Sequence, residues 1–252
     1  MMDGKRVLVI LPAWNESESI ELVLKEIQQQ LPGVDTLVVD DGSVDNTAQV
    51  AASAGATVLR LPYNLGVGGA MRLGYRYAYE QDYDIAIQVD ADGQHDPGYV
   101  PVLIQGLDSA DLVIGARFAG VGDYRVRGPR RWAMGLLSGV LSRIAGTRLT
   151  DTTSGFKACD KPMIEFFAKW YPVEYLGDTI ESMVGAIRCG FVVRQVPVAM
   201  RERNAGTPSA STTKAMIYLA RAGLVLLLAM IRRVPDSVKD ISATQRTAEV
   251  GA

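Results

Sequence analysis

The stretch Ile85-Ala-Ile-Gln-Val-Asp-Ala-Asp-Gly-Gln-His95 joins a hydrophobic segment to a pair of acidic residues. Its first part, Ile85 to Val89, has the composition of a buried strand, and Asp90 and Asp92 follow at its end. Residues at i and i+2 of a strand point to the same side, so the two carboxylates are expected to lie together. Such a pair suits Mg²⁺ or Mn²⁺, which also bind substrate phosphates. The pattern therefore indicates an enzyme acting on a phosphorylated, nucleotide-linked substrate, although a simple turn or cap remains the alternative.

The composition narrows the class of protein. The 252 residues are 48% hydrophobic and 21% charged, which is typical of a globular chain that can form a single core. The net charge of −2 argues against a nucleic-acid-binding protein that depends on phosphate neutralisation. The two cysteines, Cys159 and Cys189, form no metal-type cluster and predict a reducing, cytoplasmic compartment.

Whether the protein contacts a membrane depends on one apolar segment. The N-terminus has no apolar stretch typical of a signal peptide. Residues 217–231 are nearly all apolar, but fifteen helical residues rise only about 22 Å, which is less than the roughly 30 Å of a hydrocarbon core. We expect either a buried core helix or an interfacial helix in peripheral contact with the cytoplasmic face of a membrane.

Short β-branched segments alternate with helical patterns, which predicts an α/β fold with a mixed, mostly parallel sheet covered by helices on both faces. The expected strands are Arg6 to Leu11, Thr36 to Asp40, Thr57 to Leu61, Ile85 to Val89, Leu112 to Ala116 and Phe191 to Met200. The expected helices are Glu18 to Gln30, one opening at Asp45 or Thr47 and stopping at Gly55, and one from about Gly69 to Glu80. Residues 150–157 read as a polar turn.

Polar motifs follow three of these strands. They are Pro12-Ala-Trp-Asn-Glu16, Asp40-Asp-Gly-Ser43 and Asp90-Ala-Asp92. Ligands of open parallel sheets bind beyond the carboxyl ends of the strands. We therefore expect the three motifs to converge on one ligand site.

Six motifs in order resemble the family 2 glycosyltransferases of the GT-A fold, most closely the dolichol-phosphate mannose synthases and bacterial polyprenyl-phosphate glycosyltransferases. They are Leu11-Pro-Ala-Trp-Asn-Glu16, Val38-Val-Asp-Asp-Gly-Ser43, Asn64-Leu-Gly66, Asp90-Ala-Asp-Gly-Gln-His-Asp-Pro97, Gly115-Ala-Arg117 and Asp151-Thr-Thr-Ser-Gly-Phe156. The resemblance implies a GT-A domain over residues 1–215, with a nucleotide-binding half (1–116) and an acceptor half (117–215). Residues 216–234 would form the apolar helix and residues 235–252 a flexible tail.

The resemblance assigns residues to the donor site, which would hold a UDP- or GDP-sugar. The nucleotide-sugar ligands it implies are Pro12, Ala13, Glu16, Asp40, Asp41, Gly66 and Asp90, and the ligands of Mg²⁺ or Mn²⁺ are Asp90, Asp92 and Gln94. Three glycines, Gly66, Gly68 and Gly69, let the backbone approach the ligand closely. The chain has Val67 where the family often has a lysine, which removes one phosphate contact.

For the acceptor, the resemblance implies that Arg117, Arg131 and Ser154 bind the phosphate of a polyprenyl phosphate. The implied catalytic residues are Asp92, Arg117 and Arg131, with inversion at the anomeric carbon. A lipid phosphate is already anionic, so no strong base is required, and arginines bind its oxygens as a fork.

Two other functions stay open. A soluble family 2 transferase with a hydroxyl acceptor would need a carboxylate base, for which Asp178 and Glu181 are candidates. A non-catalytic nucleotide-sugar-binding module is the second alternative. The sugar and the choice between UDP and GDP are not determined by the sequence.

Several conspicuous residues have structural interpretations. We expect Asp96-Pro97 to start a helical segment, and Asn15 to shape a turn. His95, the single histidine, is expected to be a packed or hydrogen-bonded neighbour of the site rather than a base. A polar loop resembles a family segment that folds over the donor; it contains Arg201, Arg203, Gly206, Ser209 and Lys214.

Overall fold

The computed structural model describes residues 4–117, 138–147, 149–151, 154–172 and 178–201. The strands are β1 (Val7–Ala13), β2 (Asp35–Asp40), β3 (Thr57–Arg60), β4 (Ile85–Gln88), β5 (Leu112–Ala116), β6 (Lys157–Asp160) and β7 (Val193–Pro197). The α-helices are α1 (Ile20–Gln30), α2 (Thr47–Ser53), α3 (Val67–Glu80), α4 (Val100–Gly106), α6 (Lys161–Lys169) and α7 (Asp178–Arg188), with a further helical stretch at residues 138–145. Arg131, Arg203 and residues 216–252, for which we made predictions, lie outside the described residues.

The described strands form one sheet in the order β3-β2-β1-β4-β6-β5-β7. β1 pairs in parallel with β2 and β4, β2 with β3, and β5 with β7, whereas β6 is antiparallel to both of its neighbours. The mixed, mostly parallel sheet predicted from the sequence is therefore confirmed. β6 begins at Lys157, the last residue of the predicted polar turn, and no strand is predicted there from the sequence.

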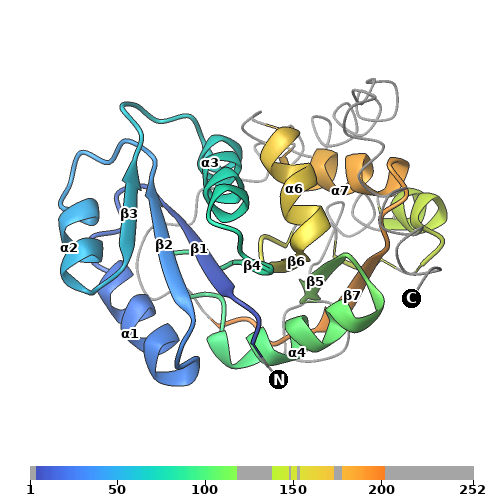
Figure 1. Ribbon diagram of the computed structural model, residues 1–252, viewed down its shortest axis with the longest axis horizontal. Coiled ribbons are helices and arrows are strands. Elements are labelled where there is room, and N and C mark those ends of the chain that lie inside the picture. The colour runs from blue at the N-terminus through green and yellow to red at the C-terminus, as the bar shows by residue number, and fades with distance from the viewer. Residues whose placement is uncertain (1–3, 118–137, 148, 152–153, 173–177, 202–252) are drawn as a thin grey trace, which may run out of the picture.

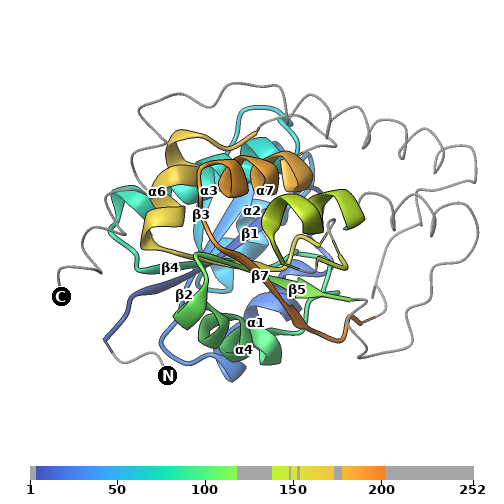
Figure 2. The same cartoon turned by 90° about the vertical axis from the view of Figure 1, so that its right-hand side faces the viewer.

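Helices cover both faces of this sheet. In Figure 1, α3, α6 and α7 lie above the sheet and α1 and α4 below it, and Figure 2 shows the same separation after a quarter turn. Alternate residues of β1 enter the two cores: Leu8 and Ile10 pack with α3 and α6, and Val9 packs with α1 and α4. Burial on both faces explains why the strand is a continuous apolar run.

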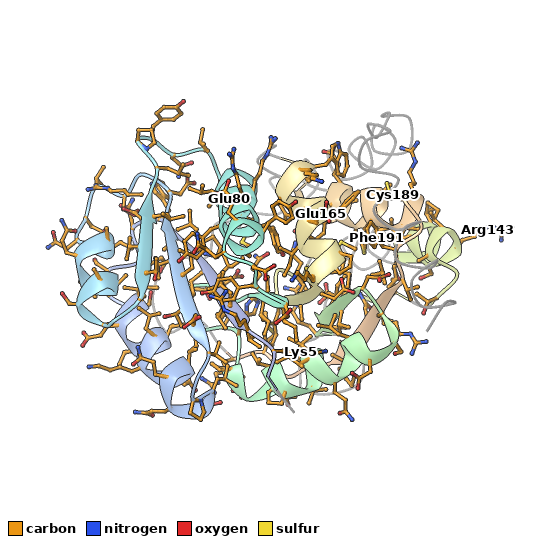
Figure 3. All side chains as sticks on the ribbon, viewed as in Figure 1. Lys5, Glu80, Arg143, Glu165, Cys189 and Phe191 are labelled. Carbon is orange, nitrogen blue, oxygen red and sulfur yellow. The ribbon has the colours of Figure 1, made fainter. Side chains whose placement is uncertain are left out.

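The core beneath α6 and α7 is rich in aromatic residues. Tyr75 of α3 lies 4.9 Å, centroid to centroid, from Phe167 of α6. Phe191, labelled beside α7 in Figure 3, packs edge-on against Phe166 at 5.1 Å. These contacts join α6 to α3 and to the residues between α7 and β7.

Several element boundaries differ from the prediction. α3 begins at Val67, because Gly66, with φ +81°, turns the chain directly into the helix. β7 is shorter than expected, and Met200 beyond it forms only an isolated antiparallel bridge with His95. Asp96 caps a short 3₁₀ helix through the Gly98 N–H at 2.9 Å, which confirms the expected start at Asp96-Pro97.

Candidate active site

The carboxyl ends of β1, β2 and β4 meet at one edge of the sheet. Ala13 pairs with Asp40, and Ile10 pairs with Gln88, so the three polar motifs that follow these strands are neighbours. A pocket of about 360 Å³ opens between them. It is lined by Pro12, Ala13, Trp14, Glu16, Asp41, Asn64, Gly66, Val67, Ala70, Asp90, Ala91 and Asp92. The expected convergence of the three motifs is confirmed by this pocket, and ligand binding in it stays a prediction.

The pocket contains most of the predicted donor residues, but not all. Asp40 and Gln94 do not line it, whereas Trp14 and Asn64 do. Neither of these two was proposed as a ligand from the sequence, although both lie inside the motifs that carried the resemblance. Their position in those motifs was the available signal.

Asp41 holds the loop at the mouth of this pocket. Its Oδ1 accepts the Leu65 N–H at 2.7 Å and its Oδ2 accepts the Gly66 N–H at 2.8 Å. Burial raises the pKa of the Asp41 carboxyl and the nearby Asp40 charge adds to this, although the two backbone N–H groups act in the opposite direction. Asp41 thus links the end of β2 to the start of α3.

Asp40 has a different environment from its neighbour. Its side chain is fully buried, its Oδ1 accepts the Ser43 N–H at 3.0 Å, and its Oδ2 forms an ion pair with Arg60 Nε at 3.2 Å. Gly42 in the same turn has φ +72°, and a Cβ there would lie 2.7 Å from the backbone of Tyr63. In this structure Asp40 therefore stabilises the turn that supports the pocket wall.

The turn after β1 depends on side-chain hydrogen bonds. Asn15 has φ +55°, its N–H donates to Ser43 Oγ at 2.9 Å, and its Oδ1 accepts the Val44 N–H at 3.0 Å. The predicted turn role of Asn15 is confirmed. Glu16 lines the pocket, and its N–H donates to Thr47 Oγ1 at 2.9 Å, which connects the turn to α2.

The acidic pair after β4 faces the pocket. Asp90 Oδ1 lies 3.3 Å from Gln88 Nε2, and Asp90 Oδ2 lies 3.5 Å from His95 Nε2. Asp92 Oδ1 accepts the Gln94 N–H at 3.0 Å. The backbone oxygen of Gln94 accepts the Arg201 N–H at 3.0 Å.

These residues fit a hard divalent cation. Asp90 and Asp92 offer carboxylate oxygens on one pocket wall, which is the ligand type that Mg²⁺ and Mn²⁺ prefer. Within the described residues, no group of three or more His, Cys, Asp or Glu is arranged to hold a metal ion. Mg²⁺ is commonly bound by one or two carboxylates together with substrate phosphates, so a two-carboxylate site suits a diphosphate ligand.

Directly after β5, Arg117 forms a two-point ion pair with Asp151. Arg117 Nε lies 2.6 Å from Asp151 Oδ2, Arg117 Nη2 lies 2.9 Å from Oδ1, and the Arg117 N–H also donates to Oδ2 at 3.1 Å. Ser154 is buried, and its Oγ accepts the Phe156 N–H at 3.3 Å. Ser154 therefore shapes the segment that follows Asp151.

The two candidate bases lie on α7. Asp178 begins this helix, and the Glu181 side chain is buried. Glu181 does not line the pocket between β1, β2 and β4.

The family follows from a comparison of the chain with known proteins. Residues 8–168 match the description Glycosyl transferase family 2. The chain belongs to this family. It is a glycosyltransferase with the GT-A fold.

Individual relatives resemble most of this glycosyltransferase. An undecaprenyl-phosphate mannosyltransferase from Micrococcus luteus is 33% identical over 240 residues, which cover 87% of this chain and 94% of the relative. A polyprenol monophosphomannose synthase from Mycolicibacterium smegmatis is 30% identical over 237 residues, which cover 87% and 88%. A glucosyl-3-phosphoglycerate synthase from Mycobacterium tuberculosis, crystallised with Mg²⁺ and uridine diphosphate, aligns with a TM-score of 0.69 at 25% identity and covers 94% of this chain and 82% of that chain.

None of the described helices is long and apolar enough to cross a membrane.

Proposed function

We propose that this glycosyltransferase moves a sugar from a UDP- or GDP-sugar to the phosphate of a polyprenyl phosphate, with inversion and with Mg²⁺ or Mn²⁺. The two relatives from Micrococcus luteus and Mycolicibacterium smegmatis are named for polyprenyl-phosphate acceptors, which supports this acceptor class. The neighbour bound to uridine diphosphate and Mg²⁺ supports a nucleotide donor and a divalent cation.

One observation in the structure carries the proposal: Asp151, which pairs with Arg117, and Gly155, which packs against Asp90, are only four residues apart in the chain. Asp151 holds the Arg117 guanidinium. A Cβ added to Gly155 would lie 3.1 Å from Asp90 Oδ1, so the backbone of Gly155 packs directly against that carboxylate. Since β4 and β5 are both antiparallel to β6, an anion bound at Arg117 would lie at the same edge of the sheet as a diphosphate bound beside Asp90.

The donor half of the reaction would depend on the pocket between β1, β2 and β4. Pro12, Ala13 and Glu16 would contact the base and ribose, because they line the end of the pocket at β1. Asp90 and Asp92 would hold the cation, which offsets the charge that develops on the leaving nucleoside diphosphate.

The acceptor half would depend on charge and orientation. A phosphate monoester is anionic near neutral pH, so it attacks the anomeric carbon without a strong general base. Arg117, whose orientation Asp151 fixes, would bind the acceptor phosphate oxygens, and Arg131 is proposed for the same task. Positioning and electrostatic stabilisation would supply most of the rate.

The test is transfer of label into lipid. The purified protein is incubated with radiolabelled GDP-mannose or a panel of UDP-sugars, Mg²⁺ or Mn²⁺ and a short polyprenyl phosphate, and label is counted in the organic phase. Metal-dependent transfer from one donor is the expected result. Hydrolysis of one donor without lipid label would exclude the lipid acceptor and favour a saccharide or hydroxyl acceptor. Nucleotide binding without any turnover would favour a non-catalytic module.

A further inference from the structure

Asp90 contacts both nitrogens of the His95 ring. The Asp90 backbone N–H donates to His95 Nδ1 at 2.9 Å, while His95 Nε2 lies 3.5 Å from Asp90 Oδ2. A ring nitrogen that accepts a hydrogen bond carries no proton, so the neutral imidazole must carry its proton on Nε2. The backbone of Asp90 thus selects the tautomer with its proton on Nε2, the ring nitrogen that lies 3.5 Å from Asp90 Oδ2.

The ring itself has little freedom to rotate. His95 is 1% exposed, and its ring stacks on Phe156 with centroids 4.8 Å apart and planes 14° apart. The backbone of His95 is also bridged to Met200 beyond β7. The Nε2–H direction is therefore set by packing from a neighbouring segment and by a backbone hydrogen bond.

Gln88 contacts the other oxygen of the same carboxylate. Its Nε2 lies 3.3 Å from Asp90 Oδ1, and its side chain is almost completely buried in β4. Its Oε1 is buried and has no hydrogen-bond partner among the described residues. A buried amide with an unsatisfied oxygen carries a desolvation cost, so its presence in a strand of aliphatic residues requires an explanation.

Gly155 packs against both the Gln88 amide and the Asp90 carboxylate. A Cβ at this position would lie 2.9 Å from Gln88 Nε2 and 3.1 Å and 3.3 Å from the two Asp90 oxygens. Any larger residue would displace the carboxylate or the amide. The Asp90 carboxylate is thus bordered by Gln88, His95 and Gly155, yet its side chain remains 37% exposed toward the pocket.

We propose that His95 and Gln88 are positioning residues that hold the Asp90 carboxylate, one at each oxygen, so that its remaining lone pairs face a divalent cation in the pocket. A carboxylate has about four acceptor positions, so two such contacts leave others for a metal ion. Partners of this kind orient metal-binding carboxylates, and their loss commonly lowers metal affinity 10- to 100-fold. The inference rests on the proposed function, because it assumes a cation beside Asp90.

Two substitutions at the histidine separate orientation from packing. In His95→Asn the short amide can still accept the Asp90 N–H, but it cannot reach the carboxylate. In His95→Gln the longer amide places an N–H near the former Nε2. We expect Mn²⁺ affinity, measured by electron paramagnetic resonance with UDP or GDP present, to fall 10- to 100-fold in His95→Asn and to recover partly in His95→Gln. Gln88→Met should weaken Mn²⁺ binding in the same way.

The controls distinguish this inference from the proposed function. Nucleotide binding without metal should stay close to wild type in His95→Asn. Both histidine variants lose the stacking on Phe156, so their melting temperatures are compared with each other, and a difference in Mn²⁺ affinity at similar melting temperature reports on orientation. Asp92→Asn should abolish Mn²⁺ binding; if it does not, the proposed metal site is wrong. If Asp92→Asn abolishes Mn²⁺ binding while His95→Asn and Gln88→Met leave it unchanged, only the positioning role is overturned.

A measurement on the unaltered protein covers the case in which the variants fail to fold. His95 is the single histidine of the chain, so the imidazole ¹⁵N resonances report on it alone. At fixed neutral pH we expect the Nε2–H tautomer, with a chemical-shift change when Mg²⁺ and the nucleotide are added together but not with the nucleotide alone. The Nδ1–H tautomer, or no response to Mg²⁺, would overturn the proposal.

Discussion

Arg117 and Asp151 are joined at two points, with Nε–Oδ2 at 2.6 Å and Nη2–Oδ1 at 2.9 Å. The Asp151 side chain is fully buried, and the Arg117 side chain is only 20% exposed. The planar guanidinium matches a carboxylate in this geometry, whereas a lysine ammonium does not. The pair therefore fixes the plane and direction of the arginine that is proposed to bind the acceptor phosphate.

Arg117→Lys should weaken binding of the acceptor more than binding of the donor. Lysine keeps the charge but loses the two-point contact with Asp151, so its ammonium is no longer held in one direction. We expect the KM for polyprenyl phosphate to rise about 10-fold or more, equivalent to at least about 1.4 kcal/mol, while the KM for the donor stays within about 2-fold. Steady-state kinetics with each substrate varied in turn measures both. An equal change for both substrates would contradict an acceptor role.

Asp151→Asn should destabilise the fold as well as reduce transfer. Removal of one partner of a buried ion pair commonly costs about 3 kcal/mol, because the other charge is left without compensation. Urea unfolding measures this change in the free energy of unfolding. A variant as stable as wild type would show that Asp151 contributes little to the packing around Arg117.

Asp92→Asn should remove metal-dependent turnover. The amide has no negative charge with which to hold a cation beside a diphosphate, so we expect the transfer rate to fall at least about 100-fold, with nucleotide binding in EDTA retained. Asp108→Asn is the matched control, because Asp108 is exposed in the 3₁₀ helix Leu107–Ser109, outside the pocket lining. Unchanged turnover in Asp92→Asn would exclude Asp92 as a metal ligand.

Gly42→Ala should disturb the pocket wall, and Gly33→Ala provides a control with similar backbone strain. Both glycines have positive φ, +72° and +86°, but a Cβ at Gly33 meets nothing within 4 Å, whereas at Gly42 it would lie 2.7 Å from Tyr63. In each variant the strained backbone conformation of alanine lowers the free energy of unfolding by about 1 kcal/mol or more. The additional loss of stability in Gly42→Ala, together with weaker nucleotide binding, would measure the contact between the Gly42 turn and the loop that contains Tyr63. Equal losses in the two variants would contradict its importance.

The stability contributed by Asp45 should depend on pH below 4. Burial disfavours the charged form, but hydrogen bonds from Thr47 and Ser17 outweigh it and lower the pKa of Asp45 from 3.8 to about 2. A lowered pKa means that the unfolded chain binds the proton more readily, so the contribution is present above pH 3.8 and is lost as the pH falls toward 2.

Asp45→Asn tests this contribution by comparison with wild type. Because Asp45 is partly exposed, we expect a loss of only about 1–2 kcal/mol at pH 7, which falls to about half of that value at pH 3. Denaturant unfolding of both proteins at the two pH values measures it. A difference that is the same at both pH values would show that the charge of Asp45 is not involved.

Much of the pocket between β1, β2 and β4 was predictable from local patterns. β-branched runs marked strands such as β2 and β4, and parallel pairing places the polar residues after such strands at one edge. The edge pocket that contains Asp41, Asp90 and Asp92 follows from this rule. Their roles as ligands stay predictions.

The region around β6 was less predictable. β6 was missed because Lys157 interrupts the apolar pattern at its start, and the preceding residues are polar and turn-forming. Lys157 is nevertheless buried, because its ammonium donates to Tyr171 Oη at 2.7 Å and lies 5.0 Å from the centre of that ring. A lysine with such partners can occupy a core strand, but its partner lies on the chain beyond α6 and is not visible in a local pattern.

The sequence by itself determined the alternation of strands and helices from β1 to β4 and the positions of the acidic motifs, because hydrophobic periodicity and the chemistry of strand ends are local properties. Only the tertiary structure decided what neighbouring carboxylates do. Asp40 turns inward to Ser43 and Arg60, while Asp41 binds the loop before α3. Arg117 meets Asp151 across 34 residues, and that pairing depends on how separate segments pack at the end of the sheet.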